Sequence, residues 1–169
     1  STGEHYSMAS LFSLNQNLIK INGGTYYAFN NEKQKKQINL EKQLLRELSL
    51  EKMLNSAEEC FAPLFHFFSK HTDILYDGCI DFAIEAYLLG AEYGKFGYHG
   101  EPVHRAMIRS EKEEKQLLHE LYEYAVSWSE AFNVQAAYEP LYYACEYFIQ
   151  SWWKEGFSQR ERRFKLRLR

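Results

Sequence analysis

The sequence of 169 residues contains few residues that interrupt helices and few that form cross-links. It has only 3 prolines and 9 glycines, and so few breakers favour long helices. Its 3 cysteines, Cys60, Cys79 and Cys145, lie far apart and form no Cys-x-x-Cys pair. This spacing excludes a disulfide-framed miniprotein and argues against a zinc site or a redox pair. We therefore expect three reduced thiols on helix faces.

Long apolar runs are also missing. The mean hydropathy is −0.52, and no run approaches the roughly 18 apolar residues that a membrane-spanning helix needs. The longest candidate, residues 79–91, is interrupted by Asp81 and Glu85. The first residues lack the cationic start and apolar stretch of a secretory signal. We expect no transmembrane segment and a cytoplasmic location.

Motifs of nucleophilic and phosphate-binding sites are absent as well. There is no Gly-x-Ser-x-Gly elbow and no Cys–His signature, and Gly94–Gly97 lacks the spacing of a phosphate-binding loop. We predict no catalytic residue, no cofactor and no metal site. One alternative stays open, because Asp81 and Glu85 belong to a row of carboxylates along one helix side. A metal-dependent enzyme would use these two with a histidine, whereas a solvated helix face explains the same spacing.

A second metal-like motif is Glu101 to His104, which has the Glu-x-x-His spacing of di-iron helical bundles. Such a site needs a second Glu-x-x-His on a facing helix, and the sequence contains none. Pro102 also places the motif in a first helical turn, at the edge of a bundle. We interpret Glu101 as a carboxylate near a helix start, where the helix dipole favours it.

Large rings are what the chain has in abundance, with 13 Tyr, 12 Phe and 3 Trp among 46% hydrophobic residues. From Glu32 onward the apolar residues recur at helical spacing. We predict that residues 32–169 form an all-α domain, a single compact bundle of five or six helices with a basic C-terminal end. Residues 1–31 are predicted to be a flexible or hairpin-like appendage, because Asn22 to Gly24 separate two short β-prone runs.

Three serines mark expected helix starts. Ser49 precedes an apolar-periodic segment and is predicted to be an N-cap. Ser56 and Ser110 are each followed by a glutamate three residues later, which is the spacing of a capping box. The sequence therefore predicts that one helix begins after each of the three serines.

The two most informative helices are the central and the last. Residues 74–95 carry the most apolar stripe and are predicted to form the central helix, with a small-residue patch at Gly90 and Gly94 where another backbone can approach. The last helix is predicted to open near Pro140. We expect Gly156 to break or bend it before the terminal segment.

The end of the chain carries the candidate interaction residues. Rings spread around the last helix instead of forming one stripe, so they are either buried on several sides or offered to a partner. Residues 160–169 hold six cations and one glutamate, a local charge of +5, so that the net charge of −3 leaves −8 for residues 1–159. The candidates are Tyr142, Tyr143, Tyr147, Trp152, Trp153, Phe157, Arg160, Arg162, Arg163 and Arg167.

The basic end has two interpretations. It contacts an acidic partner or anionic surface, or it docks onto the acidic body and complements the helix dipole. We do not expect nucleic acid, because nucleic-acid modules usually spread positive charge over a face. A protein partner or a homodimer is the expected contact.

Three stretches resemble the short, uncharacterised YbaK-type proteins of Bacillus and relatives. They are Leu40-Glu-Lys-Gln-Leu-Leu-Arg-Glu-Leu-Ser49, Gly78-Cys-Ile-Asp-Phe-Ala-Ile-Glu-Ala-Tyr-Leu-Leu-Gly90 with Tyr93-Gly-Lys-Phe-Gly-Tyr98, and Trp152-Trp-Lys-Glu-Gly-Phe157 with its basic end. The resemblance covers about residues 35–169. It implies an intracellular helical protein of unknown function and supplies no catalytic residue.

A weaker similarity, in helix number and aromatic content, is to the haem-free globin-like sensor domains of Bacillus sporulation kinases. This similarity implies a dimeric helical protein with an apolar ligand in an internal cavity. Our leading hypothesis is a non-catalytic regulatory or protein-interaction module. A globin-like sensor domain is the alternative, and a metal-dependent enzyme is the least favoured.

Overall fold

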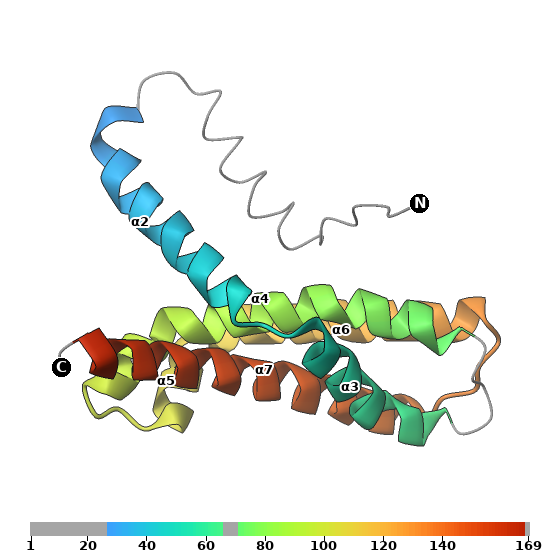
Figure 1. Cartoon of the computed structure of the whole chain (residues 1–169). Coiled ribbons are helices and arrows are strands. Elements are labelled where there is room, and N and C mark those ends of the chain that lie inside the picture. The colour runs from blue at the N-terminus through green and yellow to red at the C-terminus, as the bar shows by residue number, and fades with distance from the viewer. Residues whose placement is uncertain (1–26, 66–70, 168–169) are drawn as a thin grey trace. The chain divides into compact units, whose positions relative to one another are not determined.

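The computed structural model describes residues 27–65 and 71–167, and every regular element in these ranges is a helix (Figure 1). The elements are α2 (Tyr27–Arg46), α3 (Leu50–Phe61), the 3₁₀ turn η1 (Ala62–Leu64), α4 (Thr72–Tyr98), α5 (Val103–Arg109), α6 (Glu111–Ala131) and α7 (Tyr138–Arg167). The predicted all-α bundle of five or six helices is confirmed. The hairpin expected around residues 22–24 lies outside the described residues. As predicted, no described helix combines the length and apolarity needed to cross a membrane.

The chain divides into two compact units between Leu48 and Ser49. α2 belongs to the first unit and begins at Tyr27, a few residues before the predicted start at Glu32. Polar residues one turn apart interact along it, since Gln37 Nε2 donates to Glu41 Oε1 over 3.0 Å. Helices α3 to α7 belong to the second unit, which contains the candidate site.

Helices α3 and α7 of the second unit pack side by side and run antiparallel (Figure 1). The indole N–H of Trp152 donates to Ser56 Oγ over 3.2 Å, and the rings of Phe61 and Phe148 lie 6.0 Å apart. As the residue number increases in α3, the number of its neighbour in α7 decreases. All four of these side chains stand on the sides of the two helices that face each other.

Helix α6 is antiparallel to α4 in the same way. Trp128, near the end of α6, donates its indole N–H to the carbonyl of His71 just before α4, over 3.0 Å. One turn earlier, the Tyr124 hydroxyl donates to the carbonyl of Ile74 over 2.8 Å. These bonds give the Tyr124 hydroxyl and the Trp128 indole N–H their acceptors and fix the height of α4 against α6. Together with α3 and α7, the two helices complete an up-and-down bundle.

Helices α4 and α7 run parallel and touch through their backbones. A Cβ added to Gly90 of α4 would overlap the carbonyl oxygen of Trp153, and one added to Gly156 of α7 would overlap the carbonyl oxygen of Tyr87. The predicted small-residue patch therefore faces another helix. The expectation that Gly156 breaks the last helix is wrong, because α7 continues through it to Arg167, and the glycine instead serves close packing.

The three predicted serine caps have three different outcomes. Ser49 is confirmed as the N-cap of α3, where its side chain accepts from the Lys52 amide over 3.3 Å. Ser56 is not a cap, because α3 runs through it without interruption. Ser110 stands at the predicted start of α6 but makes no side-chain capping bond. Both of the latter serines are instead hydrogen-bond acceptors for buried tryptophans.

Candidate functional site

The aromatic residues of α7 divide into a buried and an exposed group. Trp152, Trp153 and Phe157 have exposed fractions of 7%, 0% and 4%, whereas Tyr143 and Tyr147 have exposed fractions of 56% and 68%. The exposed tyrosines all lie in the first ten residues of the helix, up to Tyr147, and the buried Phe148 follows them directly. Of the residues singled out from the sequence, the structure thus places the tyrosines at the surface and the other three rings in the core.

The two adjacent tryptophans occupy opposite flanks of α7. Trp152 points to Ser56 of α3, and the Trp153 indole N–H donates to Ser110 Oγ over 2.9 Å. Ser110 Oγ in turn donates to the carbonyl of Met107 over 3.2 Å. Each buried indole therefore has a hydrogen-bond acceptor, which removes the main cost of burying a tryptophan.

We use the name tyrosine surface for the exposed rings of α7, Tyr138, Tyr142, Tyr143 and Tyr147. Their exposed fractions are 59%, 39%, 56% and 68%. The rings of Tyr142 and Tyr143 lie 6.0 Å apart, and Tyr122 of α6 packs edge-on against Tyr142 at 5.5 Å. Edge-on ring pairs of this kind are favourable arrangements for aromatic side chains.

The tyrosine surface borders an open depression. Its lining comes from the end of α6 and the connection to α7, between Ser129 and Tyr138, and includes the buried side chain of Val134. A second depression lies between Asn55 and Pro63 on α3 and η1. Both depressions are open to solvent.

The cations of the last turns of α7 differ in their surroundings. Arg160 is partly buried, and its guanidinium lies 4.4 Å from the centroid of the Phe164 ring. Burial, followed by the charges of Arg167 and Arg163, lowers the pKa of Arg160 from its usual value. Arg162 and Arg167 are exposed. The end of α7 therefore has one cation packed onto the helix and others directed to solvent.

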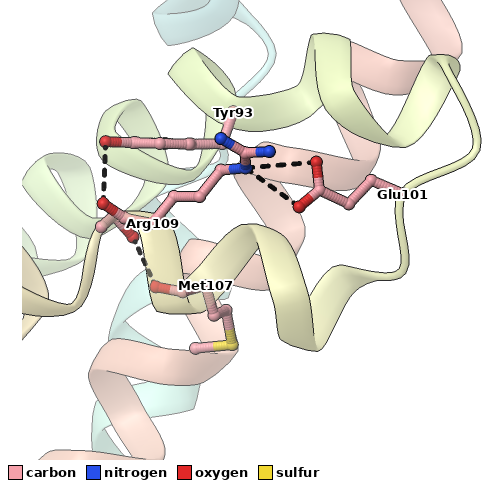
Figure 2. A network of polar contacts seen from close by, with 5 residues as sticks. Tyr93, Glu101, Met107 and Arg109 are labelled. Atoms are coloured by element: carbon pink, nitrogen blue, oxygen red, sulfur yellow. Dashed lines mark hydrogen bonds and ion pairs between the residues drawn. The ribbon is translucent and has the colours of Figure 1, made fainter.

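An ion pair beside the start of α5 accounts for the Glu-x-x-His motif. Figure 2 shows the Arg109 Nε donating to both carboxylate oxygens of Glu101, over 2.9 and 3.2 Å. The Tyr93 hydroxyl reaches the carbonyl of Arg109 at 3.5 Å, and the guanidinium lies 4.3 Å from the centroid of the Phe96 ring. Glu101 is thus a partner of an arginine that ties α5 to the end of α4.

The carboxylates considered for a metal-dependent enzyme, Asp81 and Glu85, lie on α4, and Glu85 is near Glu120 of α6. The pKa of Glu85 is raised by its burial, then by the negative charges of Glu120 and Asp81. Within residues 27–65 and 71–167, no three His, Cys, Asp or Glu side chains gather as metal ligands would. The raised pKa of Glu85 follows from partial burial beside other carboxylates.

The three cysteines come from three helices and are unpaired. Cys79 and Cys145 are buried and Cys60 is partly buried. Burial is the first cause of a raised thiol pKa at all three, to about 11 at Cys60 and about 12 at Cys145. The thiols are therefore protonated at neutral pH and are poor nucleophiles.

The surface residue that the sequence reasoning missed is Tyr122. Its signal is present in the sequence, because the apolar stripe of α6 passes through Leu118, Leu121 and Ala125, and a ring next to that stripe lies at its border. Tyr138, which was not among the candidates either, is 59% exposed at the start of α7.

Comparisons with known proteins give a family without an assigned activity. Residues 24–169 match the model of the family described as "Protein of unknown function (DUF2521)". The chain is 44% identical over 142 residues to the "Uncharacterized protein YbaK" of Bacillus subtilis (strain 168), an alignment that covers 84% of this chain and 97% of that protein. No solved structure matches.

Proposed function

We propose that this chain, which belongs to the DUF2521 family of proteins of unknown function, is a non-catalytic protein-interaction module that binds through the tyrosine surface of α7. One observation carries the proposal. Four tyrosines in the first ten residues of α7 are 39% to 68% exposed, and Tyr143 and Tyr147 share one side of the helix, whereas the rings of Phe148, Trp152, Trp153 and Phe157 are buried. Apolar rings that gather on one surface mark contact sites more often than rings scattered singly.

Tyrosine suits a contact surface for physical reasons. A ring offers a large apolar area and a hydroxyl that stays hydrogen-bonded at a wet rim, and its two side-chain torsions cost little entropy to fix. Here the cost is lower still, because Tyr142 already packs against Tyr143 and Tyr122. Such rings are enriched among the residues that dominate protein–protein affinity.

The groups considered above for catalysis or metal binding are better explained as parts of the fold. Glu101 pairs with Arg109, and the thiols of Cys60 and Cys145 have raised pKa values. Unpaired cysteines suit a reducing compartment, so we also propose a cytoplasmic location. In this proposal the protein acts in regulation or assembly by binding another protein chain.

Site-specific photo-crosslinking in the native host tests the proposal. A benzophenone amino acid placed at Tyr147 should give one discrete adduct on illumination. The control position is Ile108 of α5, which is equally exposed at 66% compared with 68% for Tyr147 and should give none. No adduct at Tyr147, or the same adducts at both positions, would refute the proposal.

A further inference from the structure

The side of α7 that faces away from the bundle carries a regular stripe. Residues spaced by three or four share one helix face, and this spacing connects exposed or half-exposed residues along most of α7. We call them the outer stripe: Tyr143, Tyr147, Ser151, Lys154, Ser158 and Arg162. Lys165 continues the same spacing; its side chain is 60% exposed and donates to Glu161 one turn earlier over 2.9 Å.

The outer stripe changes in chemistry along its length. Its first half is aromatic, and the exposed Glu139 lies one turn before Tyr143. Its second half presents the exposed cations Lys154, Arg162 and Lys165. The whole chain has the same asymmetry, with a charge of −8 on residues 1–159 and +5 on residues 160–169.

We propose that the partner bound at the tyrosine surface is a second copy of this chain, whose α7 lies antiparallel to the first across a two-fold axis near Ser151 and Lys154. This inference rests on the proposed function. The axis brings Tyr143 of each copy against Arg162 of the other, and Glu139 of each copy against Lys165 of the other. Every contact then occurs twice, as in an isologous dimer.

Charge selects this orientation. In the antiparallel arrangement the cationic half of each stripe covers the aromatic half of the other, which places guanidinium and ammonium groups on ring faces. A parallel arrangement would instead place Arg162 and Lys165 of one copy against the same cations of the other, and like charges repel. An anionic polymer or lipid surface that bound the cations would also approach residues 1–159, which carry a charge of −8 and would repel it.

The centre of the stripe combines small and large residues in a complementary way. The two-fold axis places Ser151 opposite Lys154 of the other copy and Ser158 opposite its Tyr147, so each small serine leaves room for a larger side chain. The hydroxyl of Ser151 already donates to the carbonyl of Tyr147 over 2.6 Å. Contact with another helix therefore leaves this hydroxyl hydrogen-bonded.

A charge exchange across the proposed axis tests the inference with the full chain. Sedimentation velocity measures the dimer dissociation constant of the parent chain and of Glu139→Lys, Lys165→Glu and the double variant. We expect each single change to weaken the dimer by roughly tenfold or more, because it creates two like-charge contacts. The double variant should recover most of the affinity. The two positions lie about 39 Å apart along one helix, so recovery requires a second chain.

Lys95→Glu supplies the matched control. Lys95 is exposed on α4, which packs against the opposite face of α7, and its reversal should leave the dimer unchanged. A chain that stays monomeric, or a double variant no tighter than the single variants, overturns the inference. So does a monomer that binds phosphatidylglycerol vesicles or RNA and loses that binding with Lys165→Glu.

The photo-crosslinks separate this inference from the proposed function. An adduct at Tyr147 that contains two copies of the chain supports both. An adduct with a different protein overturns the second-copy partner and leaves the interaction module standing. The absence of any adduct at Tyr147 refutes both.

Discussion

Gly156→Ala is the substitution that tests how the bundle is held together. The added methyl group would overlap the carbonyl oxygen of Tyr87, and the carbonyl carbon would lie only 2.7 Å away. Because the obstacle is backbone, neither helix can yield without moving as a whole. Extra methyl groups in packed cores cost about 1–3 kcal/mol, and we expect the upper end of that range here.

The helix itself gains from the same substitution. Alanine favours an α-helix over glycine by about 1 kcal/mol, so the net loss in the free energy of unfolding should be about 2 kcal/mol. For a domain of this size the melting temperature should fall by roughly 6 °C. Urea unfolding followed by tryptophan fluorescence and far-UV circular dichroism gives the free energy directly.

Two further glycine variants serve as comparisons for Gly156→Ala. Gly90→Ala disturbs the same contact from α4, so the double variant should lose less than the sum of the two single losses. Gly100→Ala is the contrast, because its φ of 90° makes alanine strained while nothing lies within 4 Å of the added Cβ. Gly100→Ala should lower the free energy of unfolding by about 1 kcal/mol through backbone strain alone. The backbone contact between α4 and α7 would be refuted by either of two results. Gly156→Ala could be as stable as the parent chain, or the stability losses of Gly156→Ala and Gly90→Ala could add up fully in the double variant.

Three other predictions concern polar and titratable groups. Ser110→Ala leaves the buried indole N–H of Trp153 without its acceptor and should lower the free energy of unfolding by about 1–3 kcal/mol, measured in urea; an unchanged midpoint would contradict this. Because the pKa of Glu85 is raised in the folded state, its charge costs stability above that pKa, and the cost disappears as the pH falls through it. Glu85→Gln should therefore raise the melting temperature at pH 7 and give a smaller gain near about pH 4, whereas an equal gain at both pH values would contradict the assignment. The thiol of Cys60, with a pKa of about 11, should resist iodoacetamide at neutral pH until urea unfolds the chain; rapid labelling of native protein, detected by intact mass, would refute this.

The helix positions were predictable because they depend on local patterns. Apolar spacing and the cap at Ser49 are properties of neighbouring residues, and the structure confirms both. The two wrong expectations, at Ser56 and Gly156, share one cause. Each residue has the local signature of a helix end, but its partner lies in a helix distant in sequence, Trp152 for the serine and Tyr87 for the glycine. A single sequence does not state which helices meet.

The division of the candidate surface could not be predicted for the same reason. Around α7 the sequence shows rings at every angle, and only the positions of the neighbouring helices decide which rings are covered. α3 covers Trp152, whereas no described helix of the second unit covers Tyr147, which remains 68% exposed. The sequence correctly indicated that one apolar stripe cannot accommodate all the rings. It did not indicate that tryptophan and tyrosine would separate.

The backbone contact between α4 and α7 explains that separation. Where Gly90 and Gly156 bring the two helices together, no space remains between them for a large ring. The adjacent tryptophans of α7 therefore turn to its two flanks, Trp152 toward α3 and Trp153 toward Ser110 at the start of α6. Three sides of α7 are then occupied by the bundle. The fourth side, with Tyr147, is left uncovered by the bundle, and it is the face on which we propose that a second chain binds.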